Sequence, residues 1–379
     1  MSGLGETIAQ LVHNSRQRDA AASAAPAASV ATLTEIAGFG SNPGNLRMLA
    51  YVPQGLPPGA PLVVVLHGCT QTAAGYDAGA GWSRLAERHG FALLLPEQQR
   101  ANNSNGCFNW FQPADTARVG GEAESIRQGI ARMVASHRLN PARVHVSGLS
   151  AGGAMAATLL ATYPEVFAAG AIIAGLPYGA AGSMPEAFEA MGGRRVHPAR
   201  TWGNLVRRAS PHRGPWPRIQ VWQGDADSTV RPGNAAELVK QWTDVHGLPA
   251  APSVTDQVDG AAHQAWRGAD GAVLLECFMV PGMQHGTPLN PGAPDLDGSV
   301  GRTGPFMLDA GISSTWHQAR SWGLLTAAAQ VRTEAARAAS GPLPGIALPE
   351  FAMPIAARVG DAAAVIDKAL RSAGLLKPG

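Results

Sequence analysis

Eight short segments of the chain are dominated by apolar residues, and turn-forming or polar residues separate them. Three of the later six, at 62–66, 91–95 and 171–174, are continuously apolar, as expected for strands that are buried on both faces of a sheet. The expected strands are residues 32–36, 47–52, 62–66, 91–95, 143–147, 171–174, 219–222 and 273–280. Proline and glycine between the second and third of these segments predict a turn at 53–61.

Helical patterns lie between several of these strands. Residues 122–137 repeat apolar side chains at i, i+4, i+7 and i+8, and Asn140-Pro141 ends the pattern. Apolar strands that alternate with helices predict an α/β fold whose mostly parallel, doubly wound sheet is covered on both faces.

The predicted chain organisation has three parts. Residues 1–30 are expected to form an N-terminal helix and a flexible Ala/Ser/Pro tail, residues 31–330 an α/β domain, and residues 331–379 a C-terminal helical extension. Within the domain, residues 177–217 carry prolines and arginines that interrupt the alternation of strands and helices. We expect that segment to form a helical excursion over the carboxyl edge of the sheet.

The segment RVHVSGLSAGGAMAATLL at 143–160 predicts a strand that turns directly into a helix. At the junction, GLSAG at 148–152 fits the pattern G-x-S-x-G. Only small neighbours let a strand and a helix pass so closely, and the corner residue takes a strained backbone. Its side chain then stands exposed at a helix N-terminus, where negative charge is favoured. Ser150 is therefore a candidate nucleophile, although an ordinary turn serine would fit the pentapeptide alone.

A serine hydroxyl needs a base to take its proton before it attacks a carbonyl group. In an open parallel sheet the loops after the strands share one edge, and ligands bind there. The loop after 219–222 carries Asp225 and Asp227, and the loop after 273–280 carries His285 among glycines. We assign His285 as the base and Asp227 as the acid, with Asp225 as a competitor that would otherwise brace its loop. The chain order Ser, Asp, His is that of α/β-hydrolases.

A tetrahedral oxyanion needs preorganised N–H donors, each worth ~10²–10³ in rate. The predicted donors are the backbone N–H groups of Ala151, after the nucleophile, and of Cys69, in the loop HGCTQ after the third strand. His67 in the same loop is expected to shape this turn. Two further histidines compete with the chosen base: His263, expected in a Gly/Ala loop, and His317, expected in a helix.

The stretch CFNWF at 107–111 offers flat aromatic surface for a substrate. Trp110 and Asn109 are candidate substrate-binding residues, together with Gln71 in the loop after the third strand. The neighbouring Phe108 and Phe111 fit a pocket or an ordinary core equally well.

Composition narrows the choice of partners and location. A net charge of +2 without a basic run gives no electrostatic case for nucleic acid, and no apolar stretch approaches the ~20 residues of a membrane span. The first residues lack the charged start and apolar segment of a signal peptide, so the sequence by itself predicts a cytoplasmic location. For Cys69, Cys107 and Cys277, three reduced thiols are the favoured interpretation, with a Cys69–Cys107 bridge as the alternative.

Five segments of the chain resemble the esterase family of polyhydroxybutyrate (PHB) depolymerases. That family of α/β-hydrolases also includes feruloyl and acetylxylan esterases of carbohydrate esterase family one. The segments are HGCTQTAAGYDAGAGWSRLAERHGFALLLPEQ (67–98), NGCFNWFQP (105–113), SGLSAGGAMAATLLATYPEVFAAGAIIAGLPYG (147–179), WQGDADSTVRP (222–232) and GMQHGTPL (282–289). The resemblance extends to about residue 323 and does not include residues 1–30.

The resemblance implies a serine esterase with Ser150 as nucleophile, Asp227 as acid and His285 as base, and with no metal or organic cofactor. It implies an ester substrate, PHB or its oligomers first, with feruloyl, acetylxylan or short-chain carboxylic esters as the alternative. Acyl transfer to an acceptor other than water would use the same triad. A non-catalytic granule-binding or surface-binding protein is the alternative of a different class, but binding alone needs neither Asp227 nor His285. The family is largely extracellular, and the resemblance assigns no oligomeric state.

Overall fold

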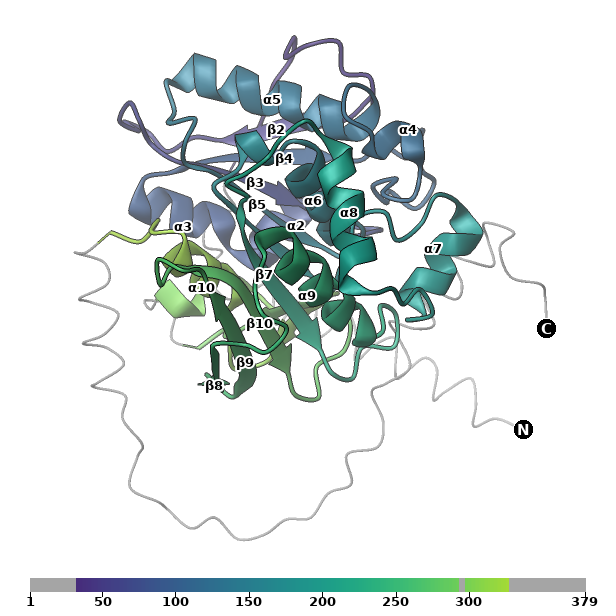
Figure 1. Ribbon diagram of the computed structural model, residues 1–379. Helices are drawn as coiled ribbons and strands as arrows, with labels where there is room; N and C mark the ends of the chain where they lie inside the picture. The colour runs from purple at the N-terminus through teal and green to yellow at the C-terminus, as the bar shows by residue number, and fades with distance from the viewer. Residues whose placement is uncertain (1–31, 293–296, 327–379) are drawn as a thin grey trace, which may run out of the picture. The chain divides into compact units, whose positions relative to one another are not determined.

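The computed structural model describes residues 32–292 and 297–326. The helix and tail predicted for 1–30 and the extension predicted for 331–379 lie outside the described residues. Within the described part, ten strands form one sheet in the order β1-β2-β4-β3-β5-β6-β7-β10-β9-β8 (Figure 1). The predicted strands at 62–66 and 273–280 have their observed bounds, and the other six differ by one or two residues at an end.

Six parallel strands form the middle of this sheet. They are β3 (Leu62–Leu66), β4 (Ala92–Glu97), β5 (Val144–Leu149), β6 (Ala169–Ile173), β7 (Arg218–Gly224) and β10 (Val273–Val280). Every residue of β3, β5 and β6 is buried, which explains the apolar sequences of β3 and β6; β5 also buries the polar residues His145 and Ser147.

Antiparallel strands complete both edges of the sheet. β1 (Thr34–Glu35) and β2 (Arg47–Tyr51) form one edge, and β9 (Ala261–Arg267) and β8 (Val254–Val258) form the other. The sequence analysis did not identify β8 and β9, because the central residues of β8 are exposed and polar.

The sequence feature that could have indicated the hairpin of β8 and β9 is its turn. Asp259 and Gly260 have φ values of 46° and 83°, and Asp-Gly is the pair favoured in a two-residue hairpin turn of this kind. His263 consequently lies on β9, so the prediction that it lies in a loop was wrong.

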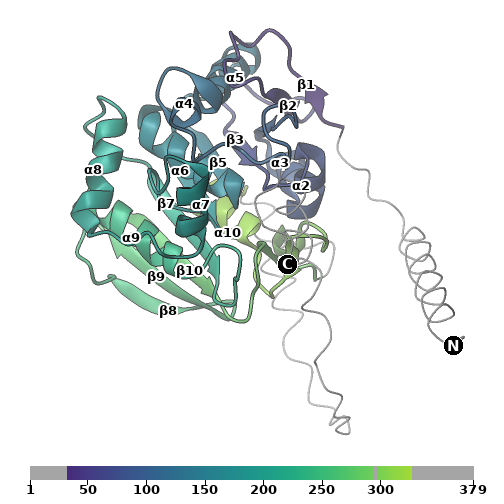
Figure 2. The ribbon, with the colours of Figure 1, turned by 90° about the vertical axis from the view of Figure 1, so that its right-hand side faces the viewer.

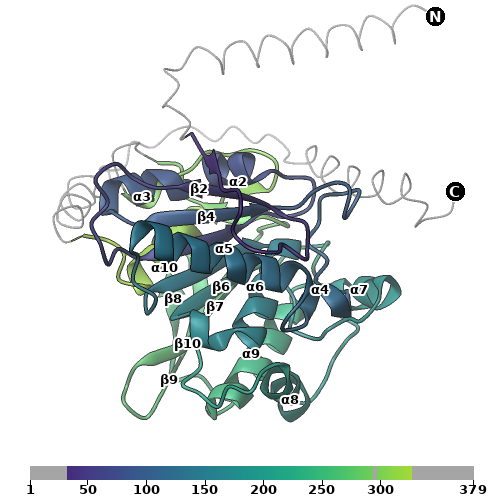
Figure 3. The ribbon, with the colours of Figure 1, turned by 90° about the horizontal axis from the view of Figure 1, so that it is seen from above.

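Helices cover both faces of the sheet (Figures 1 and 3). One face packs against α5 (Gly121–His137), α6 (Ala151–Thr162) and α9 (Gly233–His246). The other face packs against α2 (Ala73–Ala80), α3 (Trp82–His89) and α10 (Ser314–Ser321). The side chains of β3 alternate between the two cores, with Val64 in the first and Val65 in the second. The predicted helix at 122–137 is α5, and His317 lies in a helix as expected.

The segment 177–217 forms two helices with different roles. α7 (Met184–Met191) contributes to a small apolar cluster with the start of α6, at the carboxyl end of β5. α8 (Ala199–Ala209) instead packs beside α9 (Figures 1 and 2). The α8 residues Trp202 and Leu205 also belong to the apolar cluster that α7 joins.

The remaining elements are short. α4 (Pro113–Thr116) precedes α5, and the 3₁₀ turns are η1 (Pro164–Val166) and η2 (Asp297–Ser299). β11 (Thr287–Leu289) and β12 (Met307–Asp309) pair in parallel as a separate two-stranded sheet. Within the described residues, no helix combines the length and the apolar character needed to cross a bilayer.

Candidate active site

Ser150 occupies a sharp turn between β5 and α6. Its φ of 57° and ψ of −117° are rare for a residue with a side chain, and such strain persists only when the surroundings enforce it. The Ser150 backbone N–H donates to the Ile173 carbonyl over 2.9 Å. A Cβ atom at Gly148 would overlap the carbonyl of Gly152, and one at Gly152 would overlap the carbonyls of β3 and its loop. The two glycines of G-x-S-x-G are thus required by the close approach of strand and helix.

The structure brings Ser150, His285 and Asp227 together in one hydrogen-bonded chain. The Ser150 Oγ lies 2.9 Å from His285 Nε2, and His285 Nδ1 lies 2.7 Å from Asp227 Oδ2. All three residues are buried, and the Asp227 side chain is fully inaccessible. In this geometry His285 can accept the serine proton at Nε2 while Asp227 holds the other ring nitrogen.

Asp227 is fixed by its own loop. Its Oδ1 accepts the backbone N–H groups of Thr229 (2.8 Å) and Val230 (2.9 Å), and its Oδ2 also accepts from Gln223 Nε2 at 3.1 Å. Asp225 points elsewhere, because its Oδ1 accepts the Gly282 backbone N–H at 2.7 Å. Asp225 thus braces the two neighbouring loops, the role that the sequence analysis left open for it.

The two N–H groups predicted as oxyanion donors are both uncommitted. Among the described residues, neither the Cys69 N–H nor the Ala151 N–H donates to a protein acceptor. The Gly68 N–H, in contrast, donates to the side-chain oxygen of Gln71 at 2.9 Å. Gly152, in the first turn of α6, packs against the His67 carbonyl, so the loop after β3 and the start of α6 are adjacent.

His67 connects the Cys69 loop to the end of β4. Its Nδ1 lies 2.8 Å from the Gly68 carbonyl and its Nε2 lies 3.1 Å from the Gln98 backbone nitrogen. A carbonyl can only accept and a backbone N–H can only donate, so the ring is neutral with its proton on Nδ1. Burial lowers the pKa of His67, in agreement with a neutral ring.

Cys69 and Cys107 form a disulfide, so the favoured prediction of three reduced thiols was wrong. The parallel neighbours β3 and β4 end side by side, and the loops that follow them therefore meet. A backbone hydrogen bond of 2.8 Å from Thr70 to Asn105 joins the same two loops. Cys277 is free and buried, and burial raises its pKa to about 12.

A cavity of about 360 Å³ adjoins Ser150 and His285. Trp110 and Phe111 form part of its wall, with their rings perpendicular and their centroids 5.6 Å apart. Phe108 does not line it, because its fully buried ring packs against His67. The described lining also includes apolar α7 side chains and neutral polar groups from the loops around it, such as Met184, Phe188, Met191, Asn105, Gln112 and Thr229.

The three predicted substrate-binding residues all line this cavity. The Gln71 oxygen is held by the Gly68 N–H, and among the described residues its amide N–H groups have no protein acceptor. Asn109 is different, because its amide nitrogen donates to Glu122 at 2.8 Å and its oxygen accepts from Asn103 at 3.0 Å. Asn109 therefore contacts the cavity while its polar atoms are engaged within the protein.

The sequence analysis overlooked the apolar wall that α7 provides. Met184, Phe188 and Met191 lie at i, i+4 and i+7, which places them on one face of the helix. That spacing could have been identified as an amphipathic pattern within the segment 177–217.

The chain is similar to known depolymerases and esterases. The chain matches the family model described as esterase PHB depolymerase over residues 48–260. It is 46% identical over 303 residues to the poly(3-hydroxyalkanoate) depolymerase C of Paucimonas lemoignei, covering 80% of this chain and 72% of that protein. It is 35% identical over 267 residues to feruloyl esterase B of Neurospora crassa, covering 69% of this chain and 90% of that protein.

A solved structure supports the fold directly. The acetyl xylan esterase from Aspergillus awamori superposes with a TM-score of 0.62 at 28% sequence identity. The match covers 67% of this chain and 94% of that one. The α/β-hydrolase fold expected from the sequence is thereby confirmed.

Proposed function

Because this chain belongs to the esterase PHB depolymerase family and is an ester hydrolase, we propose that Ser150, His285 and Asp227 are its catalytic triad. The observation that carries the proposal is the chain of hydrogen bonds at 2.9 Å and 2.7 Å on a strained strand-to-helix turn. Ser150 is the nucleophile, His285 the general base and acid, and Asp227 the group that holds the imidazole and stabilises its charged form.

The reaction proceeds through an acyl-enzyme. The Ser150 oxygen forms a bond to the ester carbonyl carbon while its proton passes to His285 Nε2. Collapse of the tetrahedral intermediate breaks the bond to the alcohol oxygen, which takes the proton from His285. Water then attacks the acyl carbon, again with His285 as base, and the carboxylic acid leaves as the Ser150 hydroxyl is restored.

The negative oxygen of each tetrahedral intermediate is stabilised by the N–H groups of Cys69 and Ala151. Neither group donates to an acceptor in the part of the chain that the structure describes, and Ala151 is the first residue of α6, where the helix dipole favours negative charge. His67 and the Cys69–Cys107 disulfide hold the Cys69 loop in place. The donors are thus oriented before substrate binds.

The substrate class that we propose is a neutral 3-hydroxyalkanoate ester of oligomer length. The 46% identical relative is named for poly(3-hydroxyalkanoate). The cavity wall of Trp110, Phe111 and α7 suits apolar alkyl groups, and the Gln71 amide N–H groups can donate to a second ester carbonyl. Aromatic and acetyl esters are the second candidate, because the perpendicular Trp110–Phe111 pair also offers a surface for a phenolic ring.

A substrate panel tests the assignment. It compares methyl esters of 3-hydroxybutyrate oligomers with methyl ferulate, acetylated xylan and p-nitrophenyl esters of increasing acyl length. We expect kcat/KM for the hydroxybutyrate trimer ester to exceed that for methyl ferulate at least about tenfold, a difference of about 1.4 kcal/mol in the barrier. The reverse ranking would assign the site to aromatic esters, and product partitioning toward added alcohols would indicate a transferase.

A further inference from the structure

One segment of the chain supplies much of the cavity wall without regular secondary structure. Of the 22 described residues that line the cavity, nine lie between Asn102 and Gln112. This segment contains neither a strand nor a helix up to the start of α4. Its conformation therefore depends on side-chain contacts from the elements beneath it.

The side chain beneath this wall is Glu122, the second residue of α5. It is 1% exposed and does not line the cavity. Its Oε2 accepts the Asn109 backbone N–H at 2.9 Å, and its Oε1 accepts the Asn109 side-chain amide at 2.8 Å. One carboxyl group thus fixes both the backbone and the side chain of the residue that directly precedes Trp110.

Gln98, at the end of β4, extends the same network to the rest of the segment. Its amide nitrogen donates to Glu122 Oε1 at 2.5 Å and to the Cys107 carbonyl at 3.1 Å. Its amide oxygen accepts from the Gln99 backbone N–H at 2.9 Å and from the Asn102 amide at 2.7 Å. Gln98 and Glu122 therefore hold the segment between Asn102 and Gln112 at three residues: Asn102, Cys107 and Asn109.

A carboxyl group can accept all the hydrogen bonds offered at this position, although burying it there is unfavourable. Three N–H donors converge on it, and a carboxylate offers two accepting oxygens where an amide offers one. Burial raises the pKa of Glu122 and the nearby carboxyl of Asp115 adds to the increase, whereas the hydrogen bonds from Asn109 and Gln98 act in the opposite direction and favour the carboxylate. Among the described residues no basic side chain forms an ion pair with Glu122. Its hydrogen bonds therefore offset the free-energy cost of burying the carboxyl group.

We propose that Glu122 is a positioning residue that sets the shape of the Trp110 wall and thereby the preference for large over small esters. The inference rests on the proposed function, since it assumes that the cavity beside Ser150 binds the ester. Glu122 acts through Asn109 and Gln98 and does not touch the substrate. The triad residues follow β5, β7 and β10 and share no hydrogen bond with Glu122, Gln98 or Asn109 among the described residues; Asp227 is held by its own loop. The network does reach the oxyanion loop, through the Cys107 carbonyl and the Cys69–Cys107 disulfide. A change in wall shape therefore appears as a changed ratio between esters, and a change in the chemistry as an equal loss for all of them.

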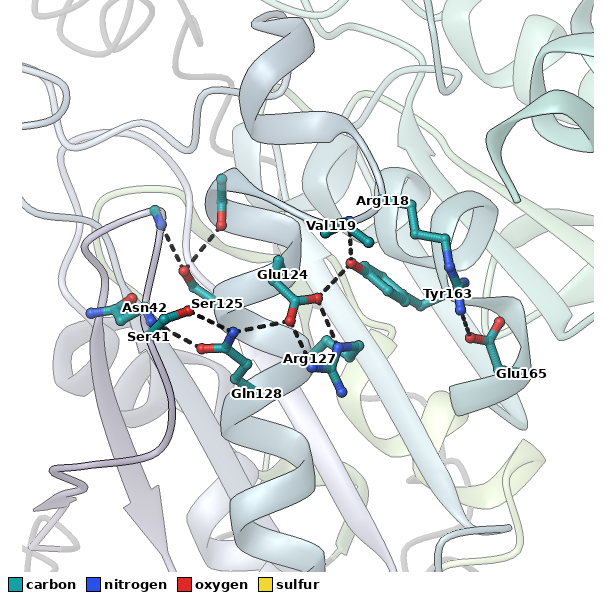
Figure 4. Close-up of polar contacts among 12 residues, drawn as sticks. Ser41, Asn42, Arg118, Val119, Glu124, Ser125, Arg127, Gln128, Tyr163 and Glu165 are labelled. Carbon is teal, nitrogen blue, oxygen red and sulfur yellow. Dashed lines mark hydrogen bonds and ion pairs between the residues drawn. The ribbon is translucent and has the colours of Figure 1, made fainter. Parts of the chain in front are cut away.

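The test compares two glutamates of the same helix. Glu122→Gln removes one accepting oxygen from the wall network. Glu124→Gln is the matched control, because Glu124 bonds to Arg127, Gln128 and Tyr163, away from the wall network (Figure 4). The readout is the ratio of kcat/KM for a hydroxybutyrate trimer methyl ester to that for p-nitrophenyl acetate, with the folded fraction measured for each variant.

We expect Glu122→Gln to lower this ratio by about threefold or more, the size of one displaced aromatic contact, and Glu124→Gln to leave it unchanged. Gln98→Leu tests the same network from β4 and is expected to lower the ratio in the same direction, so the inference does not depend on the folding of one variant. A loss that is equal for both esters, or an unchanged ratio in both network variants, would overturn the positioning role.

Binding without turnover separates this inference from the proposed triad. In a Ser150→Ala background, adding Glu122→Gln is expected to raise the Kd of the trimer ester by about threefold or more, while adding Glu124→Gln leaves the Kd unchanged. Hydrolysis that persists in Ser150→Ala would contradict the triad and leave the effect on Kd standing. An unchanged Kd with Glu122→Gln would contradict the positioning role and leave the triad standing.

Discussion

The two sides of the cavity are built on different physical principles. The side that carries Ser150, Asp227 and His285 stands on the ends of parallel strands, each hydrogen-bonded to neighbours on both sides. The opposite wall, between Asn102 and Gln112, has no such frame and is held by a disulfide, a backbone hydrogen bond and buried polar side chains. The sheet therefore fixes the position of the groups that carry out the chemistry. The wall that contacts the substrate can change its shape without disturbing the sheet.

We expect substitutions on the two sides of the cavity to have different effects on activity. Changes at the strand ends should remove turnover of every ester and leave binding intact. Changes in the wall should alter the ranking of esters and leave the hydrogen-bonded triad in place. Four variants test this separation, from the largest expected effect to the smallest.

The nucleophile gives the largest effect. Ser150→Ala is expected to lower kcat at least about a thousandfold for all esters, because no other group can form the acyl-enzyme. Ser147→Ala is the matched control: Ser147 lies on the same strand, and its buried Oγ has no hydrogen-bond partner among the described residues. Steady-state assays with active-site titration give the comparison, and activity of Ser150→Ala within tenfold of wild type would rule out the triad.

Substitution of the acid of the triad is expected to have the next largest effect on kcat. In Asp227→Asn the two N–H donors of Thr229 and Val230 would hold the amide oxygen, which turns the NH₂ group toward His285 Nδ1. The imidazole would then carry its proton on Nε2 and could not accept from Ser150, with an expected loss in kcat of about 10²–10⁴. Asp225→Asn, the control, should reduce thermal stability while leaving kcat within about twofold, because its carboxylate accepts only the Gly282 N–H in a loop contact.

A substitution in the wall is expected to have a smaller effect on kcat/KM, and one that differs between esters. Trp110→Ala should lower kcat/KM for oligomeric or aromatic esters about twofold to tenfold more than for acetyl esters, since an aromatic contact is worth ~0.5–1.5 kcal/mol beyond buried area. Trp216→Ala, a partly buried tryptophan that does not line the cavity, is the control. Specificity ratios and thermal midpoints decide the outcome. An unchanged ratio with a lowered midpoint would place Trp110 in the core and remove it from the substrate site.

The smallest effect is expected on the outer side of α5, at Glu124. Glu124→Gln should lower the free energy of unfolding by about 1 kcal/mol at neutral pH, the usual worth of such contacts, without changing ester ranking. Hydrogen bonding to Arg127 is the main reason that the pKa of Glu124 falls from 4.5 to about 2.

A lowered pKa in the folded state means that this stabilisation is present above pH 4.5 and is lost as the pH falls through about 2. Urea unfolding of wild type and Glu124→Gln at several pH values should therefore show a difference that shrinks toward acid. A difference that grows toward acid would be incompatible with an ionised, hydrogen-bonded Glu124.

The sequence predicted the chemical side far better than the wall. Ser150 stood in a pentapeptide whose glycines have a local steric meaning, and Asp227 and His285 followed apolar strands whose ends share one edge by the rules of parallel sheets. The competing Asp225 could be separated from Asp227 only by proximity: one carboxylate meets His285 and the other meets Gly282.

Trp110 and Asn109 were expected at the cavity, but the contacts that hold their wall in place were not, because these contacts join residues that are far apart along the chain. Cys69 and Cys107 are 38 residues apart, and only the side-by-side ends of β3 and β4 bring them together. Glu122 looked like an ordinary first-turn glutamate, since such residues are common at helix N-termini. Nothing in its neighbours along the chain indicates that it turns inward to Asn109 and Gln98.

Local sequence by itself determined the parallel strands, the elbow and the chemical identity of the candidate triad, because backbone strain and apolar patterning act between residues that are close along the chain. The disulfide, the engagement of Asn109, the α7 wall and the burial of Glu122 were decided only by the tertiary structure. These features depend on which loops the order of strands in the sheet makes neighbours, and on which polar groups then have to find partners away from water.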